Sequence, residues 1–112
     1  MLYFSKLRIE PRGLTQDQLW DLWEVGADTA QNTIAAGGPV VSLYKVVGQR
    51  RVIVINDVES PDDMDRILMA SPLSAHLEVE DFFPLRPYAD FAEDVRRRWS
   101  IVPKGVHDPR QR

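Results

Sequence analysis

The sequence predicts a single α+β domain, and three observations lead to that prediction. The chain has 112 residues, 44% of them hydrophobic, which suits one core of modest size. Short runs rich in aromatic and β-branched residues alternate with segments whose apolar residues recur at helical spacing. Glycine and proline separate these segments, as expected of turns. We expect the domain to span residues 1–102 and the polar segment 103–112 to form a flexible tail.

The first two elements have clear limits in the sequence. Residues 2–9 alternate as a strand, which places one set of side chains on a common face: Tyr3, Ser5, Leu7 and Ile9. Thr15 and Gln18 form a capping box, so a helix should follow and run to residue 36. Gly37-Gly38-Pro39 ends it, because proline cannot continue the helical hydrogen bonds. The apolar stripe of this helix contains Leu19, Trp23, Gly26, Ala27, Ala30 and Ile34.

The remaining elements are identified in the same way. Residues 40–47 and 52–58 are apolar strands joined by a short hairpin that begins at Gly48. Ser60-Pro61 predicts the cap and the first residue of a second helix. Residues 76–83 alternate as a fourth strand, and residues 88–99 show the apolar spacing of a last helix.

The order β-α-β-β-α-β with an extra C-terminal helix predicts a ferredoxin-like fold with an antiparallel four-stranded sheet. Right-handed connections place the strands in the order fourth, first, third, second, with both helices on one face. The other face would carry a mixture of polar and apolar residues: Phe4, Lys6, Arg8, Ser42, Tyr44, Val52, Val54, Asn56, His76, Glu78 and Glu80. Because such a face is too apolar to leave in water, we expect a homodimer or higher homo-oligomer, a dimeric α+β barrel that encloses a ligand cavity.

Composition excludes several kinds of chemistry. The chain has no cysteine, which rules out disulfides, thiolate nucleophiles and cysteine-bound metals. Its two histidines, His76 and His107, form no metal-binding motif, and no glycine-rich phosphate loop follows a strand. A net charge of −3 argues against binding nucleic acid, and the lack of a long apolar run argues against a membrane span. We therefore expect a cytoplasmic protein without a metal, whose chemistry is proton transfer.

Charged residues are expected to meet where the first and fourth strands pair. Lys6 and Arg8 would lie opposite three residues of the fourth strand, which are His76, Glu78 and Glu80. One interpretation is a ladder of cross-strand ion pairs. The other is the polar floor of a pocket, in which His76 or Glu78 moves a proton.

A second group of candidate residues comes from the first helix and the second strand. Glu24, beside Trp23 at the border of the apolar stripe, is either a solvated helix residue or a carboxylate that faces a ligand between helix and sheet. Tyr44 is suited to donate a hydrogen bond to a carbonyl, with Lys45 as a nearby cation. Arg51 is either part of a soluble hairpin or a clamp for a carboxylate.

Four sequence blocks stand in an order that identifies a family resemblance. They are Met1-Leu2-Tyr3-Phe4, Ser42-Leu43-Tyr44-Lys45-Val46-Val47-Gly48, Val54-Ile55-Asn56-Asp57-Val58-Glu59-Ser60 and the segment from Leu68 to Leu73. Together they resemble the muconolactone Δ-isomerase family over most of residues 1–85. The resemblance implies a ferredoxin-like fold, assembly into dimers and higher oligomers, and no cofactor. It also implies an activity that moves a proton between carbons of muconolactone and so shifts its ring double bond.

The chain departs from that family in residues that would shape the pocket. Typical members carry a His-Leu-Trp-Arg-like block where this chain has Ser42-Leu43-Tyr44-Lys45, and we expect residues 83–99 to form a longer C-terminal extension. These departures favour a divergent isomerase or cyclase that acts on a related small-molecule lactone, enol or polyketide-like compound. One alternative is a cofactor-free oxygenase that surrounds a phenol with aromatic and histidine side chains: Trp20, Trp23, Tyr44 and His76. The other is a non-catalytic ligand carrier or oligomeric scaffold.

These considerations give a defined set of candidate site residues. The predicted catalytic residues are Glu24, Tyr44, His76 and Glu78. The predicted substrate-binding residues are Lys6, Trp23, Ser42, Lys45 and Arg51.

Overall fold

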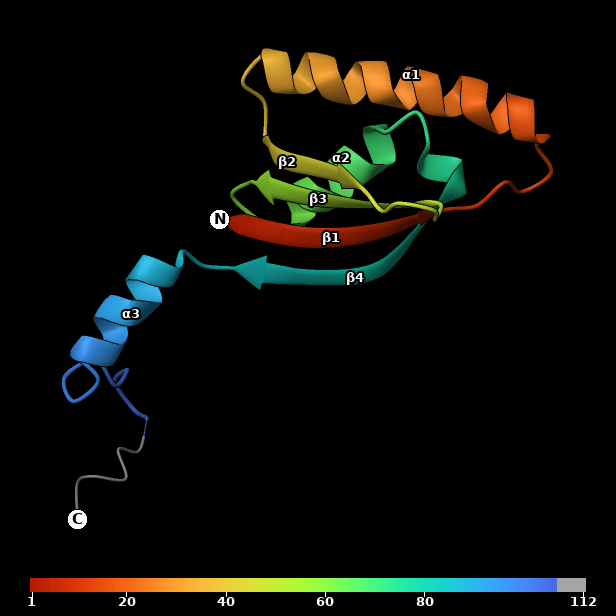
Figure 1. Cartoon of the computed structure of the whole chain (residues 1–112). Helices are drawn as coiled ribbons and strands as arrows, with labels where there is room; N and C mark the ends of the chain where they lie inside the picture. Colours follow the sequence, from red (N-terminus) through yellow and green to blue (C-terminus); the bar gives the residue numbers. More distant parts are fainter. Residues whose placement is uncertain (107–112) are drawn as a thin grey trace.

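The computed structural model describes residues 1–106 and has the predicted order of strands and helices (Figure 1). The elements are β1 (Leu2–Ile9), α1 (Gln16–Ala35), β2 (Val40–Lys45), β3 (Arg51–Asp57), α2 (Pro61–Ala70), the short 3₁₀ helix η1 (Ser74–His76), β4 (Leu77–Leu85) and α3 (Tyr88–Arg96). The α+β fold class is therefore confirmed. His107 and the rest of the segment 107–112 lie outside the described residues.

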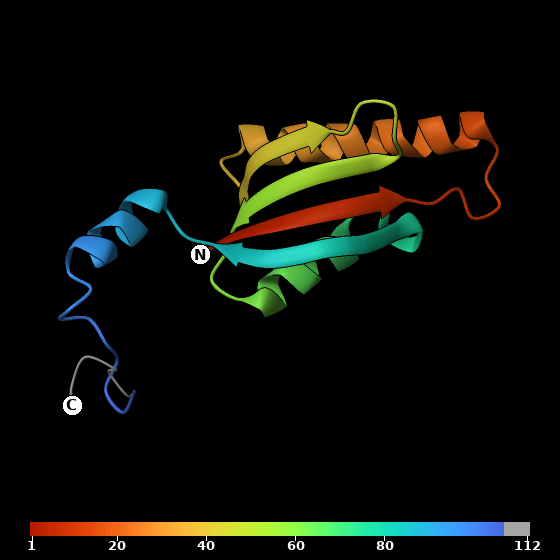
Figure 2. The same cartoon turned by 60° about the horizontal axis from the view of Figure 1, so that its bottom comes forward.

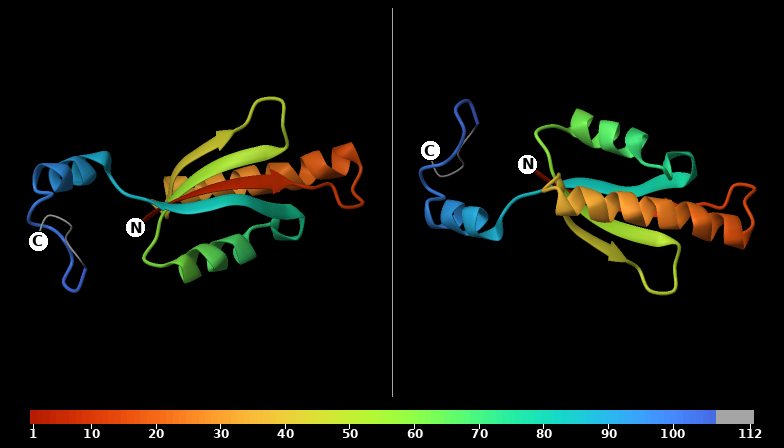
Figure 3. Two further views of the ribbon diagram at one scale, coloured as in Figure 1. Left: turned by 90° about the horizontal axis from the view of Figure 1, so that it is seen from below. Right: turned by 90° about the horizontal axis from the view of Figure 1, so that it is seen from above.

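The four strands form one antiparallel sheet in the order β2-β3-β1-β4, as the right-handed connections predict. Figure 3 shows α1 and α2 together on one face when the molecule is seen from above, and the strands uncovered when it is seen from below. Figure 2 shows the same two layers from an oblique direction. The sheet thus has one helix-covered face and one open face.

Local sequence signals set the helix ends where they were expected. The Thr15 side chain accepts a hydrogen bond from the Gln18 backbone N–H at 3.2 Å, and the Gln18 side chain accepts one from the Thr15 N–H at 2.9 Å. Ser60 caps α2, which has Pro61 at its first position. The fourth strand begins one residue later than predicted, because the His76 N–H donates to the Leu73 carbonyl at 2.8 Å and closes a 3₁₀ turn. The last helix ends at Arg96 rather than at residue 99.

Strand pairing corrects the predicted composition of the open face. Directly opposed residues of an antiparallel pair point to the same face. The pairs between β1 and β3 include Tyr3 with Asn56, Ser5 with Val54 and Leu7 with Val52. Because the β1 members of these pairs are buried under the helices, Val52, Val54 and Asn56 lie on the helix-covered face, and their predicted place on the open face is wrong. Alternation defines two faces of a strand, but only pairing with β1 decides which one the helices cover.

The hydrophobic core is divided into two clusters at opposite ends of β1. One contains Tyr3, Val58 and Met64, and the other contains Ile9, Leu19 and Leu73. The two strand residues are six positions apart, which separates the clusters by about 20 Å along the strand. The helix-covered side of the sheet between the clusters is therefore packed less tightly than its ends.

The third helix stands apart from the sheet. Figure 1 shows α3, in blue, at the far end of an extended link that leaves β4. The molecule is accordingly elongated, with extents of 65 × 28 × 26 Å. Within residues 1–106, no helix combines the length and the apolar character needed to cross a membrane.

Candidate active site

A cavity of about 460 Å³ lies between the helix-covered face of the sheet and the two helices. Its volume is in the range that holds small-molecule ligands. The middle of β1 and β3 supplies its floor, with Ser5, Leu7, Val52, Val54 and Asn56. The walls come from α1, the edge strand β2, α2 and the segment that leads from α2 to η1. This cavity occupies the space between the two core clusters.

Small residues on α1 keep this space open. Gly26, Ala27 and Ala30 line the cavity at positions where the apolar stripe of the helix faces the sheet. A Cβ atom on Gly26 would lie 2.7 Å from Cδ1 of Leu73, which is closer than atoms pack. Glycine therefore lets α1 approach the chain near η1, while the alanines that follow leave room above the sheet.

Two predicted substrate-binding residues meet at the edge of the cavity. Trp23 and Lys45 both line it, and both also line a neighbouring hollow of about 270 Å³ beside the β2–β3 hairpin. The Lys45 ammonium lies 5.8 Å from the centroid of the Trp23 ring. It donates hydrogen bonds to the backbone carbonyls of Val46, at 2.8 Å, and Gln49. These contacts fix a cation at the mouth of an apolar cavity.

The cavity floor contains two polar side chains that were not predicted as site residues. Ser5 is fully buried and Asn56 is 1% exposed. Within residues 1–106, the Ser5 hydroxyl and the Asn56 amide nitrogen have no hydrogen-bond partner. A signal for them was present in the sequence, since each is a polar residue within a strand whose neighbours on the same face are apolar.

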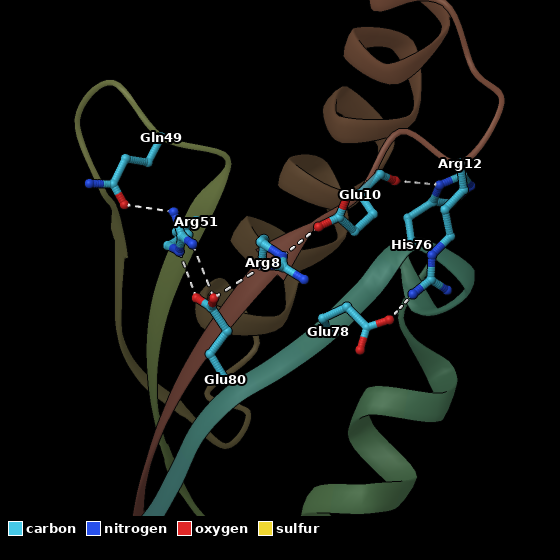
Figure 4. A network of polar contacts seen from close by, with 8 residues as sticks. All are labelled: Arg8, Glu10, Arg12, Gln49, Arg51, His76, Glu78 and Glu80. Atoms are coloured by element: carbon cyan, nitrogen blue, oxygen red, sulfur yellow. Dashed lines mark hydrogen bonds and ion pairs between the residues drawn. The ribbon is translucent and has the colours of Figure 1, made fainter.

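The predicted charged residues gather on the open face instead, in a network that Figure 4 draws. Arg51 donates two hydrogen bonds to the Glu80 carboxylate, at 2.6 Å and 3.1 Å, and Arg8 forms an ion pair with the same carboxylate at 3.7 Å. The hydrogen bonds from Arg51 lower the pKa of Glu80 below its usual value, and the Glu80 carboxylate in turn raises the pKa of Arg51. Lys6 pairs with Asp81 at 2.9 Å. This arrangement is a ladder of cross-strand ion pairs.

Two predicted catalytic residues are bound to partners near this network and do not line the cavity. His76 places Nδ1 2.8 Å from the Glu10 carbonyl oxygen, and Glu78 forms an ion pair with Arg12 (Figure 4). Arg12 also donates a hydrogen bond to the Ala75 carbonyl at 2.7 Å. These contacts hold the η1 segment against the end of β1.

The other predicted residues lie at or beyond the border of the cavity. Tyr44 borders it from β2, although pairing with Ile53 directs its side chain to the open face, where it is 60% exposed. Ser42 shares that face. Glu24 is exposed on α1, one turn before Ala27, and has no partner within residues 1–106. Over the same residues, no three histidine, aspartate or glutamate side chains gather as a metal site would require.

Comparison of the sequence and the structure with known proteins identifies a family. The muconolactone delta-isomerase family model matches residues 1–90. The crystal structure of muconolactone isomerase is similar to this structure, with a TM-score of 0.64, 18% sequence identity, and coverage of 96% of this chain and 97% of that chain. Among curated proteins, none matches this sequence.

The fold is thus shared with muconolactone isomerase, and the family model extends over the whole sheet and the residues that line the cavity. This chain belongs to the muconolactone delta-isomerase family.

Proposed function

We propose that this protein is an isomerase that moves a proton next to a carbonyl group in a small lactone, enol or polyketide-like molecule. Membership of the family supports an isomerase-type function. The observation that carries the finer proposal is the pairing of Lys45 with Trp23 at the mouth of an apolar cavity of about 460 Å³. A fixed cation at such a position suits a reaction in which negative charge develops on a substrate oxygen.

Lys45 has the capacity to hold that oxygen. An ammonium group has three N–H donors, and two of them go to the carbonyls of Val46 and Gln49. The third remains for an enolate oxygen. The carbonyl contacts and the Trp23 ring keep the ammonium in place before the substrate binds, so little reorganisation is needed when the charge forms.

Glu24 is the proposed base. None of the three predicted bases lines the cavity; His76 is bound to the Glu10 carbonyl and Glu78 to Arg12, whereas Glu24 has no partner within the described residues and directly follows Trp23, which does line it. In the proposed step, the Glu24 carboxylate removes a proton from the carbon next to the carbonyl, and the C–H electron pair forms the enolate. The protonated carboxyl group then returns the proton to a more distant carbon, which shifts the double bond without gain or loss of atoms.

We also propose that two copies of the chain pair through the open faces of their sheets. Phe4 and Phe83 stack there with ring centroids 4.7 Å apart, and Phe83 remains 43% exposed. In this dimer the open-face residues of the predicted site would border the partner subunit. They are Lys6, Ser42, Tyr44 and Arg51.

Proton exchange in deuterated water tests the proposed reaction. The native protein is incubated with muconolactone and with larger butenolides, and deuterium uptake at the α and γ carbons is followed by NMR. We expect uptake with at least one of these lactones. The Glu24→Gln variant should exchange about 100-fold more slowly or worse, because a positioned acid–base group contributes at least that factor. Lys45→Met should also be slow, while Glu59→Gln, an exposed carboxylate whose neighbours Val58 and Ser60 do not line the cavity, should match the native rate.

Two outcomes would overturn the proposal. If a lactone binds the native protein and exchanges no proton, the protein is a ligand carrier and not an isomerase. Consumption of oxygen with an electron-rich phenol, without added flavin or metal, would make it an oxygenase.

A further inference from the structure

The floor of the cavity holds two polar groups whose hydrogen-bonding capacity is unused. Ser5 and Asn56 line the cavity, and the Ser5 hydroxyl and the Asn56 amide nitrogen are buried without a partner within residues 1–106. A buried donor without a partner destabilises the folded chain, because it has lost its hydrogen bonds to water. Such groups in an otherwise apolar floor therefore point to something that binds there.

The sheet brings these two groups together. Ser5 opposes Val54 on β3, and Asn56 is two residues further along the same strand, so the two side chains are diagonal neighbours on one face. Ser5 lies between the two core clusters, and Asn56 lies opposite Tyr3 at the edge of the first cluster. The Ser5 hydroxyl and the Asn56 amide thus belong to neighbouring residues on the cavity side of the sheet.

The chemistry of this floor defines the group it accepts. Both side chains can donate to an oxygen acceptor. Among the described residues that line the cavity, Lys45 is the one with a charge, and it belongs to the mouth. A carboxylate or phosphate at the floor would be buried without a counter-charge, which is strongly unfavourable. The floor therefore favours a neutral oxygen, such as that of a ketone or a lactone.

The two ends of the cavity also set the length of the ligand. Lys45 pairs with Val52, and Asn56 lies four residues further along β3, a distance of about 13 Å along the strand. A ligand that reaches both ends must have an elongated apolar body with an oxygen function at each end.

We propose that Ser5 and Asn56 form the carbonyl-binding floor of the substrate site, and that the substrate carries a neutral carbonyl oxygen there and an enolate or carboxylate oxygen at Lys45. This inference deepens the proposed function and rests on it for the placement of the substrate in this cavity. Ser5 and Asn56 thereby determine specificity, because a ligand that lacks the inner oxygen leaves both donors unpaired.

A matched pair of unreactive probes tests the floor separately from the mouth. The probes are 1-indanone-5-carboxylate and indane-5-carboxylate, which differ in the carbonyl, and calorimetry measures their dissociation constants. The native protein should bind the ketone about tenfold more tightly than the hydrocarbon. Ser5→Ala and Asn56→Leu should each reduce this ratio by about three- to tenfold, the usual effect of one net hydrogen bond. Lys45→Met should weaken both probes equally and preserve the ratio.

Ser74→Ala is the matched control for Ser5→Ala. Ser74 is exposed on η1 and does not line the cavity, so the same atomic change there should leave the ratio unaltered. The melting temperature of the ligand-free protein gives a second readout. Ser5→Ala should melt no lower than the native protein, because it removes an unpaired buried hydroxyl, whereas a purely structural serine would lower the melting temperature on substitution.

Each outcome decides the proposal. A native protein that does not prefer the ketone, or a Ser5→Ala variant that keeps the full preference, overturns it. The Ser5 variant suffices if Asn56→Leu does not fold. If the native protein prefers the ketone probe but exchanges no proton with any lactone, the carbonyl floor is supported and the isomerase function is rejected. If it exchanges protons but does not prefer the ketone probe, the isomerase function is supported and the carbonyl floor is rejected.

Discussion

At the scale of single residues, the charged side chains of the open face pair with one another across the strands. Lys6, Arg8 and Arg51 each face a carboxylate of β4. These ion pairs are those that the ladder interpretation of the sequence predicts, although Lys6 pairs with Asp81. The pairing within it depends on a β-bulge, because the register between β1 and β4 shifts after Lys6, which pairs with Asp81 and leaves Glu80 free to turn toward Arg51. No alternation rule predicts such an extra residue.

The Glu80–Arg51 pair predicts an acid dependence of stability. Hydrogen bonds from Arg51 hold the pKa of Glu80 below its ordinary value of 4.5. A carboxyl group whose pKa is lower in the folded state stabilises the fold above its unfolded pKa, and this contribution is lost as the pH falls through its folded pKa. Native protein should therefore melt at a higher temperature than Glu80→Gln at pH 7, and the difference should shrink as the pH falls below the ordinary pKa of 4.5 and disappear once the folded-state carboxyl group is protonated. A difference that persists unchanged into acid would contradict this assignment.

At the scale of elements, the ends of α1 and α2 follow from short-range signals. Both caps act within four residues, so the sequence by itself locates them. The predicted limits of β4 and α3 differ more from the structure. His76 joins a turn whose carbonyl partner is Leu73, and the last helix stands apart from the sheet, so its final turn gains no support from packing on the sheet.

Removal of the α1 cap should weaken the whole domain. Thr15→Ala deletes the oxygen that accepts the Gln18 backbone N–H and should lower the free energy of unfolding by about 1 kcal/mol. Urea denaturation followed by circular dichroism measures this change. Gln31→Ala, at an exposed position in the middle of the same helix, serves as the control and should change stability little. Equal stability of Thr15→Ala and the native protein would show that the cap does not support the fold.

At the scale of the whole molecule, the uncovered side of the sheet predicts self-association. The stacked rings of Phe4 and Phe83 lie there beside Ile53 and Ile55, which pair with Lys6 and Phe4 in β1. A monomer would leave this apolar surface in water. The same molecule carries α3 away from its body with Tyr88 and Phe91 exposed, which adds further apolar surface for a second copy.

A charge at the centre of the open face should separate the copies. Phe83→Asp should shift the native dimer or larger oligomer towards monomer in sedimentation velocity, because an unpaired carboxylate would be buried in the interface. Val47→Asp, at a hairpin position that is 93% exposed, should keep the native assembly. If the native chain sediments as a monomer at all concentrations, the dimer proposal fails.

The sequence by itself determined the order of elements, the strand order, the helix caps and the family resemblance, because these depend on local pattern and on the handedness of connections. It also marked Trp23 and Lys45 as binding residues, and the structure brings them together. Only the tertiary structure decided the face of β3, the bulge at Glu80 and the cavity between the two core clusters. It also placed Ser5 and Asn56 among the residues that line this cavity. Burial is set by contacts between segments far apart in the chain, and no local pattern contains that information.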